Sequence, residues 1–227
     1  MSKRIVELDL FRGIAVVLMV IFHAVFDLAY YFGFEIDYAR GFWYYEGRLS
    51  AISFMFIAGI SSCLSRNPAR RGIKLFLFGM GITAVTYFWE KANYIKFGIL
   101  HFLGTSYLLS VFFKNLNSFL LVLVAALLFA AWTYFDSITT ANPYLFPLGI
   151  TTPYFSSLDY YPLVPYFGVF LLGIAFGKEF YARGHRVFRE LGENVFSLLG
   201  RHSLFVYLIH QPLILLFLHM ARKSGIL

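Results

Sequence analysis

Seven stretches of the chain are apolar over a length that suits a helix crossing a lipid bilayer. They cover residues 10–32, 49–65, 72–89, 97–113, 117–135, 163–181 and 203–221. About 20 apolar residues in an α-helix span the hydrocarbon core, and the second and fourth stretches lie near the short limit of that range. Backbone polar groups in lipid must be satisfied within the segment, which favours helices. The pattern therefore predicts an all-α fold, a polytopic transmembrane helix bundle of about seven spans, organised as a single domain over residues 1–227.

Two connecting segments interrupt this pattern. Residues 136–162 are rich in aromatic residues and proline, hold no Lys or Arg, and cannot form a regular helix. We predict a re-entrant or irregular segment there, because its apolar character lets it dip into a bilayer where other helices cover its backbone. Residues 178–201 are basic and are expected to form a short amphipathic helix at the cytoplasmic face.

Composition strengthens the membrane interpretation. Of the 227 residues, 59% are hydrophobic and only 14% are charged, against about 25% charged in a typical soluble domain. The net charge of +7 would suit nucleic acid if it formed a patch on a soluble fold, but it lies in short segments between apolar runs. We therefore expect membrane lipids, and no nucleic acid, among the partners.

The placement of Lys and Arg predicts the topology. With the N-terminus in the cytoplasm, the inner segments hold twice as many Lys and Arg as the outer ones. We expect a multi-pass protein of a prokaryotic plasma membrane. The sequence leaves the oligomeric state open, and a homodimer is one arrangement that it allows.

The first apolar stretch carries ionisable residues on one face. Arg12 and His23 are separated by ten residues, and Asp27 follows one turn later. At 100° per residue, all three fall on one side of a helix, with His23 roughly 16 Å deeper than Arg12. Such groups are costly in a span unless they face a protein interior or a wet cavity. The functional interpretation is an imidazole acting as a general base beside a carboxylate; the structural alternative is an Asp–His clasp between helices.

Other polar residues of the spans extend this picture. His101 and His210 lie inside the fourth and seventh stretches. Each alone is typical of a hydrogen-bonded core histidine, but three histidines within spans favour a shared cavity. Glu46 and Arg48 are expected either to face that cavity from outside or to pair with each other in a loop. Cys63 is the only cysteine and no His-x-x-x-His spacing exists, so we expect no metal.

Several motifs resemble the transmembrane acyltransferase superfamily. The segment from Leu8 through Ala15 to His23 is similar to its opening helix, and the Arg-x10-His spacing is similar to that of the acyltransferase-3 enzymes. Further motifs resemble small bacterial members of the heparan-alpha-glucosaminide N-acetyltransferase catalytic domain family: Asp27-Leu28, Gly98–Gly104, Asp159-Tyr160-Tyr161-Pro162, and Gly200-Arg201-His202-Ser203-Leu204 followed by His210-Gln211-Pro212.

The resemblance implies an activity and a set of site residues. It implies a membrane-embedded acyltransferase that moves an acetyl group from cytosolic acetyl-CoA, or another acyl-CoA, to a hydroxyl or amine of a glycan or lipid-linked sugar across the membrane. His23 would be the base and Asp27 would orient or charge it, with His101 as a further catalytic candidate. Arg12 would contact the CoA phosphates, and Asp9, His210 and Arg201 are the other residues expected to bind the co-substrate.

The residues alone leave two other classes of protein as alternatives. A proton-coupled transporter or lipid exporter would use Asp27, His23, His101 and His210 as a relay. Transporters often contain paired broken helices, and the sequence holds no such pair. A non-catalytic membrane scaffold would bind no CoA and would tolerate loss of His23.

Overall fold

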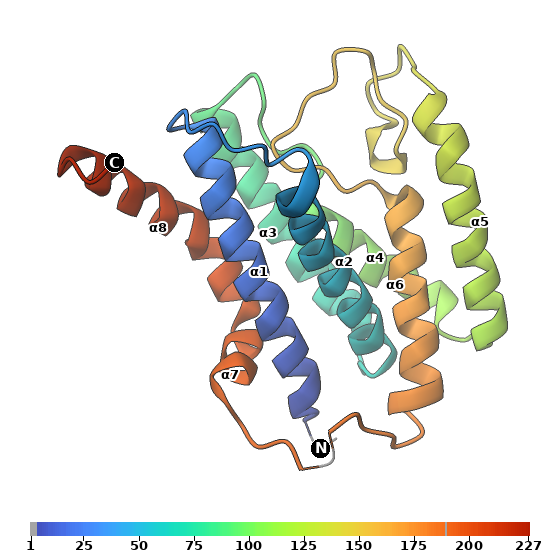
Figure 1. Cartoon of the computed structure of the whole chain (residues 1–227). Helices are drawn as coiled ribbons and strands as arrows, with labels where there is room; N and C mark the ends of the chain where they lie inside the picture. Colours follow the sequence, from blue (N-terminus) through green and yellow to red (C-terminus); the bar gives the residue numbers. More distant parts are fainter. Residues whose placement is uncertain (1–3, 189) are drawn as a thin grey trace. The chain divides into compact units, whose positions relative to one another are not determined.

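The computed structural model describes residues 4–188 and 190–227, which form helices and connecting segments without a strand in that part of the chain (Figure 1). The fold is all-α. The elements, in chain order, are α1 (Val6–Tyr30), α2 (Gly41–Cys63), α3 (Pro68–Trp89), α4 (Ile99–Phe113), α5 (Ser118–Ser137), the 3-10 helix η1 (Phe146–Leu148), α6 (Leu163–Phe176), the π-helix η2 (Gly177–Tyr181), α7 (Val195–Arg201) and α8 (Ser203–Lys223).

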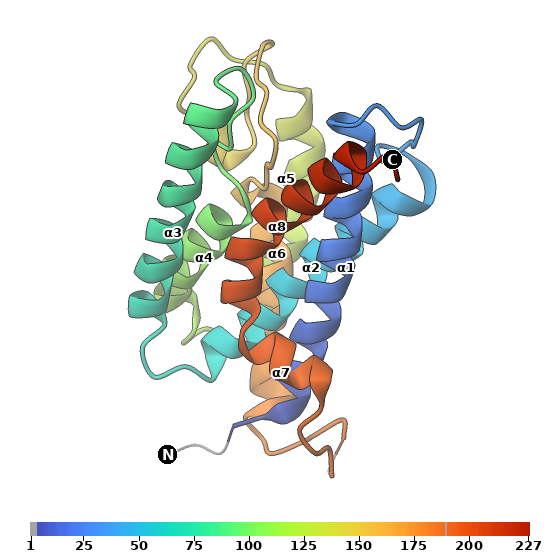
Figure 2. The ribbon, with the colours of Figure 1, turned by 90° about the vertical axis from the view of Figure 1, so that its left-hand side faces the viewer.

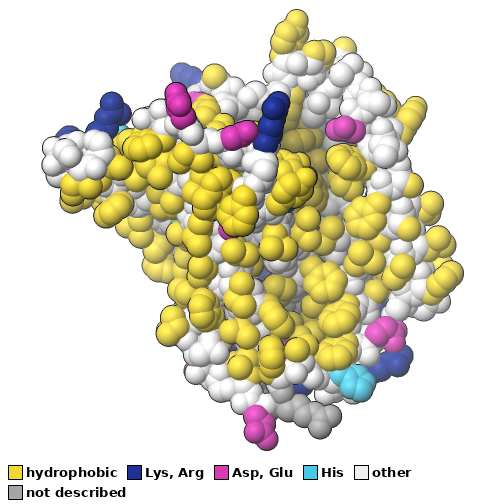
Figure 3. All heavy atoms as spheres, viewed as in Figure 1, with side chains coloured by type: hydrophobic (Ala, Val, Ile, Leu, Met, Phe, Trp, Pro, Cys, Tyr) yellow, Lys and Arg dark blue, Asp and Glu magenta, His cyan; other side chains and the backbone are white. Residues whose placement is uncertain are grey.

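Each predicted apolar stretch is helical over most of its length. Among the described residues, five helices are long and apolar enough to cross a membrane: α1, α3, α5, α6 continued by η2, and α8. Helix α4 is apolar but shorter, with 15 residues, in line with the short fourth stretch of the sequence. Large hydrophobic side chains such as Phe119 and Leu127 are exposed on α5, which suits contact with lipid. Figure 3 shows hydrophobic side chains covering much of the face in view.

The chain divides into two compact units. The first unit holds the chain up to Phe54 and from Arg186 onward, and the second runs from Met55 to His185. Helix α2 begins in the first unit and ends in the second. The single-domain organisation of residues 1–227 stays a prediction.

Close helix contacts at glycines build the first unit, in which α1 packs against α7 and α8 (Figure 2). A Cβ added at Gly13 of α1 would lie 1.8 Å from the Phe196 carbonyl oxygen of α7. A Cβ at Gly200 of α7 would lie equally close to the Asp9 carbonyl oxygen of α1. The missing side chains allow the two backbones to touch, so these glycines fix α7 against the start of α1.

The second unit pairs α3 with α4 and α5 with α6. Glycines again permit the approach: a Cβ at Gly104 of α4 would lie 2.6 Å from the Phe76 backbone nitrogen of α3. Buried polar side chains are satisfied locally, as where Ser62 donates a 2.7 Å hydrogen bond to Ser110. These contacts place helix backbones at van der Waals distance, a common way to pack helices in lipid.

The predictions for the two connecting segments, residues 136–162 and 178–201, had different outcomes. The segment predicted as irregular over 136–162 is irregular from residue 138 onward, since α5 continues to Ser137. It holds η1 and two isolated bridges, of Thr139 with Thr151 and of Tyr160 with Phe97; a re-entrant position stays a prediction. The expected amphipathic helix over 178–201 is wrong for most of its length. After η2, helix structure among the described residues resumes only at α7, because Gly184 has a φ of +87° and Asn194 starts a new helix with a capping box.

Candidate functional site in the first unit

The predicted polar face of the first helix is present on α1. Because α1 is continuous from Val6 to Tyr30, Arg12, His23 and Asp27 do share one side of it. The C-terminal part of this face meets α8. The His23 and His210 rings lie edge to face with their centroids 4.7 Å apart, so two of the three histidines singled out from the sequence form a pair.

The hydrogen bonds of this pair indicate which ring nitrogens carry protons. His23 Nδ1 lies 2.8 Å from the Met19 carbonyl oxygen, and His210 Nδ1 lies 2.7 Å from the Tyr207 carbonyl oxygen. A carbonyl oxygen only accepts, so each Nδ1 must donate. In the neutral rings each Nε2 is then a proton acceptor. The His210 Nε2 is buried and has no hydrogen-bond partner in the part of the chain that the structure describes.

Asp27 is held by α8 rather than by the neighbouring histidine. Its side chain is fully buried, and its Oδ1 accepts a 2.6 Å hydrogen bond from Nε2 of Gln211. Asp27 Oδ2 and Gln211 Oε1 are buried and have no hydrogen-bond partner among residues 4–188 and 190–227. Among the described residues, no hydrogen bond or ion pair joins Asp27 to His23. The arrangement is therefore two imidazoles beside a carboxylate–amide pair, with several hydrogen-bond acceptors left open.

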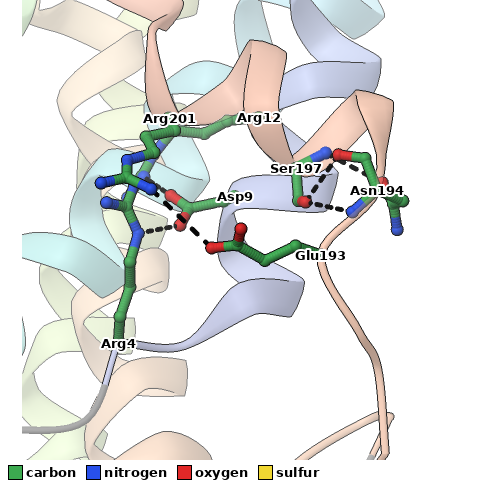
Figure 4. Close-up of polar contacts among 7 residues, drawn as sticks. All are labelled: Arg4, Asp9, Arg12, Glu193, Asn194, Ser197 and Arg201. Atoms are coloured by element: carbon green, nitrogen blue, oxygen red, sulfur yellow. Dashed lines mark hydrogen bonds and ion pairs between the residues drawn. The ribbon is translucent and has the colours of Figure 1, made fainter.

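A second group of charged side chains lies at the start of α1 (Figure 4). Asp9 accepts hydrogen bonds from Arg4 Nε at 2.5 Å and from Arg12 Nη1 at 2.7 Å. The hydrogen bond with Asp9 raises the pKa of Arg4. Arg201 of α7 lies 3.8 Å from Glu193. We call these five residues the arginine cluster; its three guanidinium groups exceed its two carboxylates by one positive charge.

A small pocket adjoins the arginine cluster. Its polar lining comes from Arg4, Asp9, Glu193, Ser197 and Arg201. Three of the four residues predicted to bind the co-substrate, Asp9, Arg12 and Arg201, thus belong to this cluster. The fourth, His210, pairs with His23 instead.

Two residues of this unit were missed as site or framework residues. Gln211 was noted only as part of the final motif, and its role depends on which face of α8 meets α1. Glu7 was overlooked; it is 2% exposed and accepts hydrogen bonds from the backbone N–H groups of Val187 and Phe188. An acidic residue in the first turn of a helix favours the helix N-terminus, which was the one available signal for Glu7.

His101 belongs to the second unit. It is 2% exposed, and its Nε2 lies 3.2 Å from the Thr83 hydroxyl oxygen of α3. The Phe76 and Phe97 rings contact it at centroid distances of 5.6 and 5.8 Å. These contacts are those of a hydrogen-bonded core histidine, and a catalytic role for His101 stays a prediction.

Together these features define a class: an integral membrane bundle with buried acid–base groups on its first and last helices and cations at the start of the first helix. The chain belongs to a family of this class, because the family model "Heparan-alpha-glucosaminide N-acetyltransferase, catalytic" matches residues 4–212. The match runs from before α1 to Pro212 and includes His23, Asp27, His210 and Gln211. Searches of curated proteins and of solved structures gave no significant match.

Family membership has direct consequences. It indicates a membrane acetyltransferase, and it confirms the resemblance to the heparan-alpha-glucosaminide N-acetyltransferase catalytic domain family. The likeness of the Arg-x10-His spacing to the acyltransferase-3 enzymes stays a prediction. It favours the acetyltransferase over the proton-coupled transporter. The family match does not identify the acetyl donor, the acceptor substrate or the catalytic residues of this chain.

Proposed function

We propose that this protein transfers an acetyl group from cytosolic acetyl-CoA to a hydroxyl or amine of a glycan or lipid-linked sugar, with His23 as the base. The observation that carries the proposal is the fixed state of the histidine pair. Both Nδ1 atoms are committed to backbone carbonyls, which leaves the Nε2 atom of each neutral ring ready to accept a proton.

The chemical step follows from this state. The Nε2 atom of His23 removes the proton from the acceptor hydroxyl or amine while the oxygen or nitrogen attacks the thioester carbonyl carbon. A C–O or C–N bond forms, the C–S bond breaks, and the CoA sulfur leaves as thiolate. The imidazolium then returns its proton to the thiolate, so the products are the acetylated acceptor and free CoA.

The open hydrogen-bond acceptors near the histidine pair suit binding of the substrate that receives the acetyl group. Asp27 Oδ2, Gln211 Oε1 and His210 Nε2 are all buried without a hydrogen-bond partner among the described residues. The two oxygens can each accept a hydrogen bond, and so can His210 Nε2 when the ring is neutral. Buried polar atoms without partners cost free energy, so a group of them is complementary to a ligand rich in donors. Sugar hydroxyls and amines supply such donors. Asp27 then binds the acceptor, and Gln211 positions Asp27.

The arginine cluster suits binding of acetyl-CoA, the acetyl donor. The CoA phosphates are anionic, and guanidinium groups bind phosphate oxygens through paired N–H donors. Asp9 holds Arg4 and Arg12 in place, which reduces the entropy lost when the side chains bind phosphate. The positive-inside rule places this end of α1 at the cytoplasm, where acyl-CoA is found.

The test compares His23→Gln with a matched histidine variant in lipid nanodiscs. His219 lies on α8, its Nδ1 also contacts a helix carbonyl, that of Leu215, and its ring lies against Phe32. We expect His23→Gln to lower the turnover of acetyl-CoA with a sugar acceptor by about 10²–10⁴-fold and to leave acetyl-CoA affinity unchanged. His219→Gln should behave as wild type.

Two results would contradict the proposal. Turnover of His23→Gln within threefold of wild type would remove His23 as the base. Failure of the wild-type protein to bind acetyl-CoA, measured by calorimetry on the same nanodiscs, would remove the donor and with it the acetyltransferase activity of this chain.

A further inference from the structure

Glu46 lies on the face of α2 that packs against α1 within the first unit. One turn further along α2, the Ser50 hydroxyl donates a 2.9 Å hydrogen bond to the Ala15 carbonyl oxygen. Next to Glu46, a Cβ added at Gly47 would lie 2.6 Å from the Phe22 ring. Residues 46, 47 and 50 occupy an arc of about 100° on a helix, so the Glu46 side chain leaves α2 from this same packed face.

The Glu46 carboxylate is buried without a partner. The residue is 8% exposed, and neither Oε1 nor Oε2 has a hydrogen-bond partner in the part of the chain that the structure describes. Pairing with Arg48 was one of the two arrangements expected from the sequence, but no hydrogen bond joins Glu46 to Arg48 among the described residues. The Arg48 guanidinium lies over the Tyr44 ring, 4.8 Å from its centroid. An unpaired buried carboxylate is expensive and is a poor way to stabilise a bundle.

The packing connects Glu46 to the histidine pair. Gly47 contacts the Phe22 ring, and that ring lies edge-on to the His23 ring with centroids 5.8 Å apart. Glu46 of α2 therefore lies at about the same height along α1 as His23. On α1, Ala15 and Phe22 face α2, while His23 and Asp27 face α8; the two faces are about 110° apart. Unpartnered acceptor atoms thus come from both helices that flank His23.

We propose that Glu46 binds the acceptor substrate, accepting hydrogen bonds from a hydroxyl or ammonium group adjacent to the one that is acetylated. This inference rests on the proposed function. It adds a residue of α2 to the site for the acceptor substrate, which otherwise consists of residues of α1 and α8. Both Glu46 oxygens are open, whereas Asp27 contributes only Oδ2. Glu46 therefore provides more acceptor capacity than any other single side chain on this level, and its charge favours an ammonium over a hydroxyl.

The test uses Glu46→Gln in nanodiscs with acetyl-CoA as donor and two probe acceptors, glucosamine and methyl glucoside. The variant keeps one acceptor oxygen, loses the charge and changes the size little. We expect the acceptor KM to rise at least tenfold for glucosamine and less for methyl glucoside, with acetyl-CoA affinity unchanged. The melting temperature of the ligand-free variant should equal or exceed that of wild type, because an unpaired buried carboxylate has been removed.

Ser50→Ala is the matched control on the same face of α2. Its hydroxyl is satisfied by Ala15, so its loss should lower the melting temperature slightly and leave the acceptor KM unchanged. A lower melting temperature for Glu46→Gln, with equal losses for donor and acceptor, would assign Glu46 a structural role and overturn the proposal.

The remaining outcomes separate this inference from the proposed function. Transfer by Glu46→Gln with an unchanged acceptor KM for both probes overturns the Glu46 assignment alone. Wild-type protein that binds acetyl-CoA but acetylates neither probe overturns the sugar acceptor on which Glu46 depends. Wild-type protein that does not bind acetyl-CoA overturns the proposed function itself.

Discussion

Gln211 of α8 donates a 2.6 Å hydrogen bond to Oδ1 of Asp27 on α1. The two residues are 184 positions apart in the chain, so this bond ties the first helix to the last one inside the first unit. It uses Oδ1 of Asp27 as acceptor and Nε2 of Gln211 as donor, and among the described residues Asp27 Oδ2 and Gln211 Oε1 have no hydrogen-bond partner. The bond thus holds a buried carboxylate in one orientation while keeping an acceptor for a ligand.

A double-mutant cycle tests this relationship. Gln211→Leu leaves the buried Asp27 carboxylate without its donor, which should cost about 1–3 kcal/mol of stability. Asp27→Asn removes the buried charge and keeps an oxygen for Gln211, so it should cost little. When both changes are combined, the loss should be smaller than for Gln211→Leu alone, as measured by denaturant unfolding in mild detergent. Strictly additive effects would mean that the two side chains are not coupled.

The arginine cluster yields a prediction about the donor. Arg201→Gln removes one of three guanidinium groups near the pocket, and we expect acetyl-CoA affinity to fall about tenfold, equivalent to the roughly 1.4 kcal/mol of one charge-assisted hydrogen bond. Acetyl-pantetheine, which carries the thioester but no phosphate, should bind both proteins equally. Titration calorimetry with the two donors measures the difference.

An arginine outside the cluster controls for general charge loss. Arg183 forms an exposed ion pair with Glu179 in the second unit, and Arg183→Gln should leave both affinities unchanged. An equal loss of affinity for acetyl-CoA and acetyl-pantetheine in Arg201→Gln would show that Arg201 does not bind phosphate.

The contact between α1 and α7 yields a prediction about backbone packing. Gly200→Ala places a Cβ 1.8 Å from the Asp9 carbonyl oxygen, so α7 must move away from α1. We expect a lower melting temperature and weaker acetyl-CoA binding, because Asp9 and Arg201 lie on the two helices that separate. Gly192→Ala is the control, since a Cβ there meets nothing within 4 Å. Wild-type behaviour of Gly200→Ala in both measurements would contradict this packing.

The sequence was sufficient for the helices and for the polar face of α1. Apolar runs long enough to cross a bilayer have few alternatives to a helix, and a period of 3.6 residues aligns Arg12, His23 and Asp27 whatever surrounds them. The expected helix over 178–201 was wrong because its basic pattern outweighed the turn signals at Gly184 and Asn194. Charge alone does not maintain a helix across such residues.

The partners of the site residues could not be predicted. Pairing between His23 and His210, and between Asp27 and Gln211, depends on how α8 rotates against α1. One sequence without covariation holds no information on that rotation. The same reason explains why Asp27 was expected to orient His23: spacing places them on one face, but the side chains find closer partners on α8 and in the helix backbone.

The start of α4 yields a prediction about pH. Asp159 Oδ2 accepts a 2.9 Å hydrogen bond from the Ile99 backbone N–H, and a Cβ at Gly98 would lie 2.3 Å from that oxygen. Burial raises the pKa of Asp159 from its ordinary 3.8 to about 6, although the Ile99 N–H favours the ionised form. Between these two values the folded chain binds more protons than the unfolded chain. The contribution of Asp159 to stability is therefore largest near pH 4, decreases as the pH rises toward 6, and is constant above it.

Asp159→Asn should remove this dependence. The asparagine keeps an oxygen for the Ile99 N–H but does not ionise, so the melting temperature should vary less between pH 4 and 6 than in wild type. At pH 7 the variant should be at least as stable as wild type, because no charge must be buried. Asp136→Asn, at an exposed position of α5, controls for the loss of a carboxylate. A variant that melts lower than wild type at pH 7, with an unchanged pH profile, would mean that the ionised Asp159 stabilises the start of α4.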